Sequence, residues 1–349
     1  MKLFIILFLI ITSINAQETL KIAGWDVYSD PDNPSKTIGY ESFEKEFNIK
    51  IEFKPLSNLN DIVEASESSA DYDLFIISNE GISILHDMEL ASPLNLNLLP
   101  EYQSLHPSLR YTKWGQFNGN VYAVPWAWGP TGLMYDADVM SMPTSWNVLW
   151  DKKYIGKVAM WDDVSIIWTT ALSLGFKNVY SLTKSQLSKV KAKLLEFNKL
   201  KAHYYAGGGD EINLIKDGKI VAYNSWYNPS ARLKKLGKNF SMNIPKEGAV
   251  GMFDSYMIRS DSKHKVLAHK YINHQIMPNI QKSMTRITGL APSNIETLGL
   301  LNRDEIKFLH LDEQDYFSKM ILWDHMPRKN LYEKLLNEIK KDYSSRTKN

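Results

Sequence analysis

Apolar and polar residues alternate along the first part of the chain in a way that predicts strands and helices in turn. Strands are expected over 19–25, 49–53 and 72–78, with helices over 37–47 and 62–68. The third strand is apolar almost throughout, which is typical of a strand buried on both faces. Strand–helix alternation indicates a parallel sheet covered by helices, so the chain should begin with an α/β lobe.

A second α/β pattern begins after Pro125. Strands are expected over 158–161 and 219–223, and helices over 164–174, 182–200, 229–236 and 329–341. In open α/β sheets, ligands bind beyond the carboxyl ends of the strands. Two such ends fall at Trp25-Asp26 and at Ser78-Asn79-Glu80, which makes these residues candidates for a binding site.

The N-terminus resembles an export signal. Lys2 precedes an apolar run over 3–14, and small or polar residues follow up to Gln17, so cleavage is expected after Ala16. The run is too short for a comfortable membrane span. We therefore expect an exported protein in the periplasm of a Gram-negative bacterium.

The amino-acid composition excludes several classes of function. Forty-one basic and 39 acidic side chains leave a formal net charge of +2. A charge this small provides no strong positive potential to bind the phosphates of nucleic acid, which is therefore not an expected partner. The chain has no cysteine, so disulfides, thiolate catalysis and iron–sulfur clusters are excluded. The eight histidines show no metal-binding spacing, and no cofactor or metal is expected.

Several short strings together resemble the periplasmic spermidine/putrescine-binding proteins, a polyamine type of extracellular solute-binding protein. Each string is weak alone, but their order spans essentially the whole chain after the leader. The strings that carry the resemblance are 22–28 (IAGWDVY), 43–51 (FEKEFNIKI), 72–78 (YDLFIIS), 121–129 (VYAVPWAWG), 144–158 (TSWNVLWDKKYIGKV) and 244–255 (IPKEGAVGMFDS).

The resemblance implies an α/β fold of the type II periplasmic binding protein class, with two lobes that each hold a mixed sheet flanked by helices and a ligand between them. Its expected division is a signal peptide over 1–16, lobe one over 17–127 and 252–299, and lobe two over 128–251 and 300–349. The implied protein is a non-catalytic monomer that delivers a polyamine to an inner-membrane ABC permease. A membrane signalling receptor is the alternative partner.

A polyamine needs aromatic faces for its methylenes and carboxylates for its ammonium groups. The family match assigns ligand contacts from both lobes. The expected ligand-binding residues are Trp25, Asp26, Tyr28, Ser78, Glu80, Asp163, Trp226, Asp254 and Asp324.

Five positions depart from the family pattern. Ile166 stands where relatives often have an acid, Met252 replaces an aromatic residue, and Leu290 replaces a tyrosine. The acid usual two residues after the first tryptophan falls one position early, as Asp26. Glu80, where relatives commonly carry an aromatic residue, could compensate. These departures leave open a polyamine of another length.

Other interpretations of the same residues stay open. Single tryptophans more often pack than bind, and we assign Trp114, Trp146, Trp150 and Trp168 to packing. Asp162 or Asp163 could cap the helix that follows. The ligand could instead be another amine, a sugar, a carboxylate or a metal chelate. An enzyme using Asp162 and Asp163 as paired carboxylates is disfavoured, because adjacent side chains diverge and no catalytic motif is present.

Overall fold

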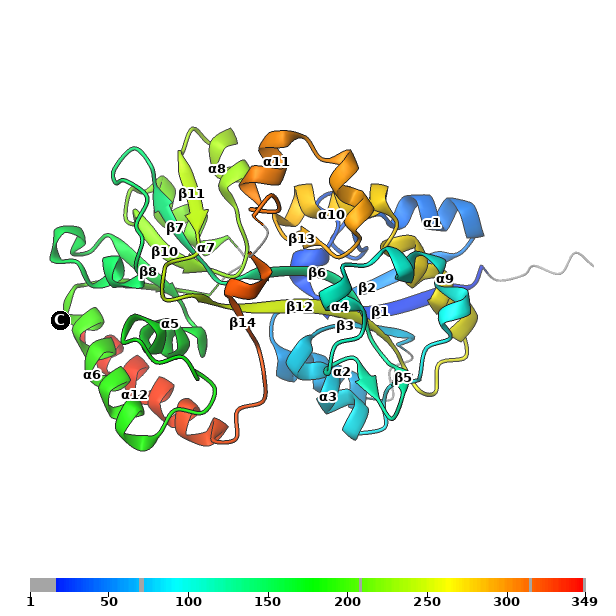
Figure 1. Ribbon diagram of the computed structural model, residues 1–349, viewed down its shortest axis with the longest axis horizontal. Coiled ribbons are helices and arrows are strands. Elements are labelled where there is room, and N and C mark those ends of the chain that lie inside the picture. The colour runs from blue at the N-terminus through cyan, green and yellow to red at the C-terminus, as the bar shows by residue number, and fades with distance from the viewer. Residues whose placement is uncertain (1–16, 69–71, 207–208, 314–315, 348–349) are drawn as a thin grey trace, which may run out of the picture.

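A computed structural model shows two lobes lying side by side along the long axis of the molecule (Figure 1). It describes residues 17–68, 72–206, 209–313 and 316–347. The predicted export signal over 1–16 lies outside the described residues. Within the described residues, no helix combines the length and the apolar character needed to cross a membrane.

Lobe one is built on a seven-stranded mixed sheet. Its order is β13-β6-β12-β3-β1-β2, and β14 also pairs with β12. β1 runs parallel to β2 and β3, whereas β12 runs antiparallel to both β3 and β6. The strands are β1 (Thr19–Trp25), β2 (Lys50–Leu56), β3 (Leu74–Ser78), β6 (Val124–Pro130), β12 (Ala249–Ile258), β13 (Ala291–Pro292) and β14 (Met320–Leu322).

Lobe two holds a five-stranded mixed sheet in the order β11-β7-β10-β8-β9. β8, β9 and β10 are mutually parallel, so their carboxyl ends share one edge. The strands are β7 (Gly132–Asp136), β8 (Val158–Trp161), β9 (His203–Tyr205), β10 (Ala222–Ser225) and β11 (Phe240–Asn243). A separate hairpin, β4 (Gln116–Phe117) with β5 (Asn120–Val121), belongs to lobe one.

Helices flank both sheets, as the alternating pattern predicts. Around lobe one lie α1 (Tyr40–Phe47), α2 (Leu59–Glu67), α3 (Asn79–Asp87), α4 (Pro107–Arg110), α9 (Lys265–Gln275), α10 (Pro278–Thr288) and α11 (Arg303–Phe308). Around lobe two lie α5 (Ser165–Ser173), α6 (Lys184–Lys199), α7 (Asp210–Lys216), α8 (Ser230–Lys235) and α12 (Lys329–Thr347).

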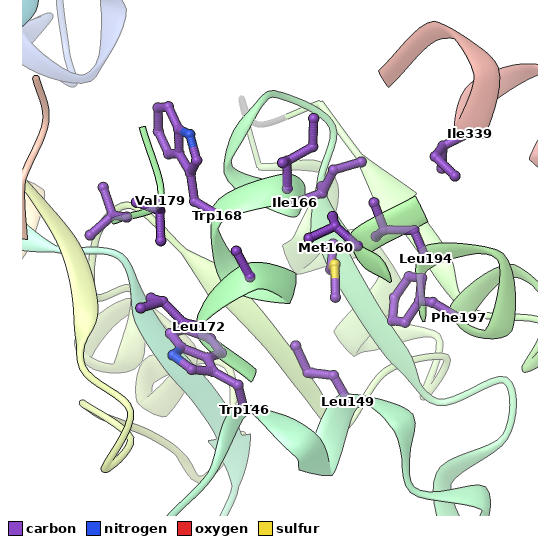
Figure 2. Packing of buried hydrophobic residues seen from close by; sticks show 14 of the residues in the cluster. Trp146, Leu149, Met160, Ile166, Trp168, Leu172, Val179, Leu194, Phe197 and Ile339 are labelled. Carbon is purple, nitrogen blue, oxygen red and sulfur yellow. The ribbon is translucent and has the colours of Figure 1, made fainter. Parts of the chain in front are cut away.

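The core of lobe two shows why α5 sits where it does. All nine of its residues are buried, and Ile166 and Trp168 belong to one apolar cluster with Met160 and Leu172, part of which Figure 2 shows. Burying side chains of this size contributes about 1.5–3 kcal/mol each. Ile166 is therefore a core residue, which accounts for the absence of an acid at this position.

Several element boundaries differ by a few residues from those expected, and two of the differences have a clear local cause. The strand expected over 219–223 begins at Ala222, because Gly218 adopts a left-handed turn (φ 64°) and Lys219 still donates to the Leu214 carbonyl at the end of α7. The helix expected over 329–341 continues to Thr347. An ion pair between Arg346 and Asp342, one turn apart, supports the added length.

The chain passes between the sheets three times. β6 joins β7 through Thr131, β11 joins β12, and β14 leads into α12. Before the last passage, α11 contacts lobe one, where Glu305 pairs with Arg286 of α10 at 2.6 Å. The division of the chain at residues 127, 251 and 299 stays a prediction.

Candidate functional site

The lobe-one part of the candidate site is centred on Asp254. This residue lies in β12 beside Ser78, the last residue of β3, and a bulge interrupts the pairing with β6 at Asp254/Ser255. Tyr28, in the short 3-10 helix that follows β1, donates its hydroxyl to the Asp254 carboxylate at 2.5 Å. Residues 226 positions apart in sequence thus meet beyond the carboxyl ends of β1 and β3.

Asp254 is a buried acid without a basic partner. It is 4% exposed, and no ion pair reaches it from the described residues. Burial raises its pKa to about 7, although the Tyr28 hydrogen bond and the nearby Trp25 indole favour the charged form. The Trp25 Nε1 and Ser78 Oγ atoms are buried and have no hydrogen-bond partner. A cation at this position would neutralise a charge that the protein leaves uncompensated.

The lobe-two part pairs Asp163 with Trp226. Asp163 follows β8 and Trp226 follows β10, and these parallel neighbours bring the two residues to one edge. The Trp226 indole donates to Asp163 Oδ2 at 2.9 Å, and the backbone N–H of Ser165 donates to Asp163 Oδ1 at 2.7 Å. Asp163 therefore does satisfy a free amide at the start of α5, and it also orients Trp226. Burial raises its pKa, and these hydrogen bonds oppose that rise.

A cluster of three tryptophans lies at the boundary between the lobes. Trp226 stacks on Trp323 with 5.6 Å between ring centroids and 22° between planes. Trp168 meets Trp323 at 5.3 Å and Trp226 at 6.2 Å, both edge to face. Trp226 and Trp323 pack against the apolar cores of both lobes. We call Trp168, Trp226 and Trp323 the tryptophan cluster.

Glu80 and Asp324 lie near one another at the passage into α12. Burial raises the pKa of Glu80 to about 7, with Lys329 lowering it and Asp324 raising it. Asp324 pairs with Lys113 at 2.6 Å and accepts from the Trp114 indole at 3.4 Å. Burial alone would raise the pKa of Asp324, but the Lys113 hydrogen bond holds it below its usual value. Both acids therefore lie where the lobes meet.

Asp26 is exposed and takes no part in the hydrogen bond between Tyr28 and Asp254. It accepts from the Ser57 hydroxyl at 2.9 Å, and its charge acts on the Tyr227 phenol of lobe two. The lobes are in close contact nearby. Gly289 has φ 71°, and a Cβ there would lie 2.4 Å from the Asn228 carbonyl oxygen. Asp26 is thus at the rim of the interlobe boundary.

The apolar residues that depart from the family pattern are buried. Met252 is 8% exposed and Leu290 is 2% exposed, and both belong to the core of lobe one. Trp168 is a core residue, as expected, but its contacts with Trp226 also support the candidate site. Trp323 was not singled out from sequence, because nothing local indicates a stack on a residue 97 positions earlier. The one sequence signal for Trp323 was its position next to Asp324, which was itself expected to bind the ligand.

No group of three or more metal-binding side chains that could hold an ion occurs in the described parts of the chain. Two surface hollows lie elsewhere, one beside Lys36 and Tyr40 and one on the outer face of α12. They contain none of the predicted site residues. The chemistry of the site therefore rests on carboxylates, hydroxyls and indoles, which suit an organic cation.

Comparison with known proteins gives one family and a consistent fold. The model described as "Bacterial extracellular solute-binding protein" matches residues 40–298. The putrescine-binding periplasmic protein PotF of Escherichia coli K12 is 26% identical over 284 residues, covering 76% of this chain and 75% of that protein. The spermidine/putrescine-binding periplasmic protein of the same organism is 24% identical over 289 residues, covering 81% and 80%.

Among solved structures, the spermidine/putrescine ABC transporter substrate-binding protein PotD from Streptococcus pneumoniae superposes with a TM-score of 0.78. It is 20% identical, and the match covers 94% of this chain and 100% of that chain. At this identity the likeness concerns the fold alone. The predicted two-lobed α/β fold is confirmed.

Proposed function

Because the chain belongs to the bacterial extracellular solute-binding proteins, we propose that it captures a polyamine between its lobes and delivers it to an ABC-type importer. The proposal places the protein in the periplasm of a Gram-negative bacterium, which agrees with the periplasmic names of the relatives and with the export-type leader. The importer's permease is the proposed partner, and a membrane signalling receptor remains the alternative.

The observation that carries the proposal is the buried, unpaired carboxylate of Asp254. An ionised acid in a low-dielectric surrounding is costly unless a positive charge accompanies it. An ammonium group bound at the Asp254 carboxylate, beside the Tyr28 hydroxyl, would supply that charge, and Ser78 and the Trp25 indole lie near the same carboxylate. An anionic ligand would meet a second negative charge instead, so carboxylates fit this site poorly.

The aromatic part of the proposed site combines Trp226 of lobe two with Trp323 of the last passage between the lobes. The stacked faces of Trp226 and Trp323 suit the methylene groups between ammonium centres, and indole faces attract cations by about 0.5–2 kcal/mol. Asp163 holds Trp226 in place and offers a further acceptor. We propose that Asp26, Glu80 and Asp324 act at the margin of the site, where their charges favour cation entry.

Calorimetric titration of the ligand-stripped protein tests this function. The panel contains putrescine, cadaverine, spermidine, norspermidine and spermine, with glucose and succinate as uncharged and anionic controls. We expect tight binding of one or two polyamines with a clear length optimum, and no heat from the controls. Heat from a control but from none of the five amines would replace the polyamine with another solute. Absence of measurable binding heat with every compound in the panel would contradict the proposal.

A further inference from the structure

A second carboxylate in lobe two has no role in the site described above. Glu211 lies in α7, which follows β9, and its side chain is 0% exposed. Because β9 is parallel to β8, Glu211 lies beyond the same sheet edge as Asp163 and Trp226. The helix that carries it, α7, packs near β10 (Figure 1).

Glu211 is incompletely paired. The Tyr227 hydroxyl donates to its Oε1 atom, whereas Oε2 is buried and has no hydrogen-bond partner. No ion pair reaches Glu211 from the described residues, and Arg232, which acts electrostatically on Tyr227, makes none with it. A fully buried carboxylate with a free oxygen is unfavourable unless a cation or a hydrogen-bond donor completes it.

A series of neighbouring aromatic rings begins at Tyr227, which contacts this carboxylate. Tyr227 meets Trp161 at 6.0 Å, Trp161 meets Tyr205 at 5.2 Å, and Tyr205 meets Tyr223 at 5.7 Å between ring centroids. Burial, with the nearby charge of Glu211 adding to it, raises the pKa of both Tyr205 and Tyr223. The Tyr223 hydroxyl is also buried without a partner. An acid framed by aromatic faces is the arrangement that binds ammonium groups.

The group also reaches the interlobe boundary. Tyr227 packs against the core of lobe one, and its phenol lies close enough to Asp26 for that charge to affect its pKa. Trp226 is its immediate neighbour in sequence. Tyr227 thus separates Glu211 from the proposed polyamine site and covers the carboxylate with its own hydroxyl.

We propose that Glu211 and the rings of Trp161, Tyr205, Tyr223 and Tyr227 form a second ammonium subsite. It takes the far ammonium of the same polyamine whose other end lies at Asp254, and the incoming N–H groups replace the Tyr227 hydroxyl on the carboxylate. The inference rests on the proposed polyamine function and deepens it.

Calorimetric titration of Glu211→Gln with putrescine, spermidine and spermine tests the subsite. We expect at least a tenfold loss of affinity for the longer amines and less than a threefold loss for putrescine, which is too short to use both ends. Asp217→Asn, an exposed acid at the other end of α7, is the matched control and should bind like wild type. If wild type and Asp217→Asn show a second binding event that Glu211→Gln lacks, the subsite binds a separate small ammonium ion and not the far end of the same polyamine.

Two results would overturn the inference. One is unchanged affinity of Glu211→Gln for every amine. The other is an equal loss for all of them together with a lower melting temperature, as expected of a structural role. Tyr227→Phe keeps the inference testable if Glu211→Gln fails to fold: loss of the competing hydroxyl should tighten spermidine binding about threefold. Weaker or unchanged binding would contradict it. Absence of amine binding by wild type would instead contradict the proposed function.

Discussion

Lobe one is acidic and lobe two is basic. Segments 17–130 and 248–323, which form lobe one and its connections, hold 16 Lys and Arg against 25 Asp and Glu. Segments 131–247 and 324–349 hold 24 against 14. The near-neutral total therefore hides two opposite fields. The overall net charge therefore conceals how this chain could attract a cation.

The two lobes also bring different groups to their boundary. Lobe one contributes a buried carboxylate held by a tyrosine, Asp254 with Tyr28. Lobe two contributes most of the aromatic surface, with Asp163 orienting Trp226. The comparison suggests a division of labour in which lobe one attracts and neutralises the cation and lobe two covers its methylene groups. Four predictions test this division, from the largest expected effect to the smallest.

Asp254→Asn should have the largest effect. Loss of the charge weakens polyamine binding by about 50-fold, close to the 2 kcal/mol expected for a hydrogen bond to a charged group. Because the variant removes an uncompensated buried charge, the ligand-free protein should be more stable than wild type at pH 8. Calorimetry and thermal unfolding measure the two quantities. Asp87→Asn, with a 77% exposed side chain, is the control. Equal affinity of Asp254→Asn and wild type would show that lobe one does not neutralise the ligand.

Acidic pH should weaken binding nearly as much. The pKa of Asp254 is about 7, so lowering the pH from 8 to 5.5 protonates it and raises the dissociation constant roughly 30-fold. Asp254→Asn should lose most of this dependence. The folding stability of the ligand-free protein should change with pH in the opposite direction to the affinity. Stability from protonated Asp254 is complete below its ordinary pKa of 3.8 and is lost as the pH rises through about 7.

Parallel titrations and melting curves of wild type and Asp254→Asn isolate that contribution, because every other titrating group is shared. A wild-type affinity that stays constant from pH 8 to 5.5 would show that Asp254 does not contact the ligand as an anion.

Trp226→Ala tests the part played by lobe two. Removal of one face of the stack should weaken binding about tenfold, or 1.4 kcal/mol, while Trp226→Phe should lose about half of that free energy. Trp150→Phe, in the core of lobe two, controls for a general loss of packing. Titration of all three with the best amine decides the point. If Trp226→Ala binds like wild type, the aromatic surface belongs elsewhere.

Ionic strength should have the smallest effect. Raising salt from about 0.02 to 0.3 M screens the acidic field of lobe one and should slow association a few-fold, with little change in dissociation. Stopped-flow measurements separate the two rates. Association that is independent of salt would mean that the charge difference between the lobes does not guide the ligand.

Most of the fold could be predicted from local patterns. β1 and β8 occupy the expected residues, and α6 lies within the helix expected over 182–200, with Thr183 and Gln186 forming a capping box at its start. β10 was misplaced by three residues, because the turn at Gly218 depends on hydrogen bonds back to α7 that hydrophobic periodicity does not encode.

The site was less accessible to such reasoning. The resemblance named Tyr28 and Asp254, but only the structure shows that they form one hydrogen-bonded pair. Trp323 and Glu211 were missed, since a stack across the boundary and a buried carboxylate behind a tyrosine leave no local signature. Pairings between distant residues arise from the sheet order and the crossings, which short sequence windows do not contain.

The path of the last crossing has a practical consequence. Because β14 leads α12 onto lobe two, the chain ends on that lobe, whereas β1 begins at the far end of lobe one (Figure 1). A donor fluorophore near Glu18 and an acceptor near Thr347 would therefore be attached to different lobes. With no native cysteine to block, two engineered thiols would label these positions alone. Energy transfer between them would follow each opening and closing of the protein in single molecules.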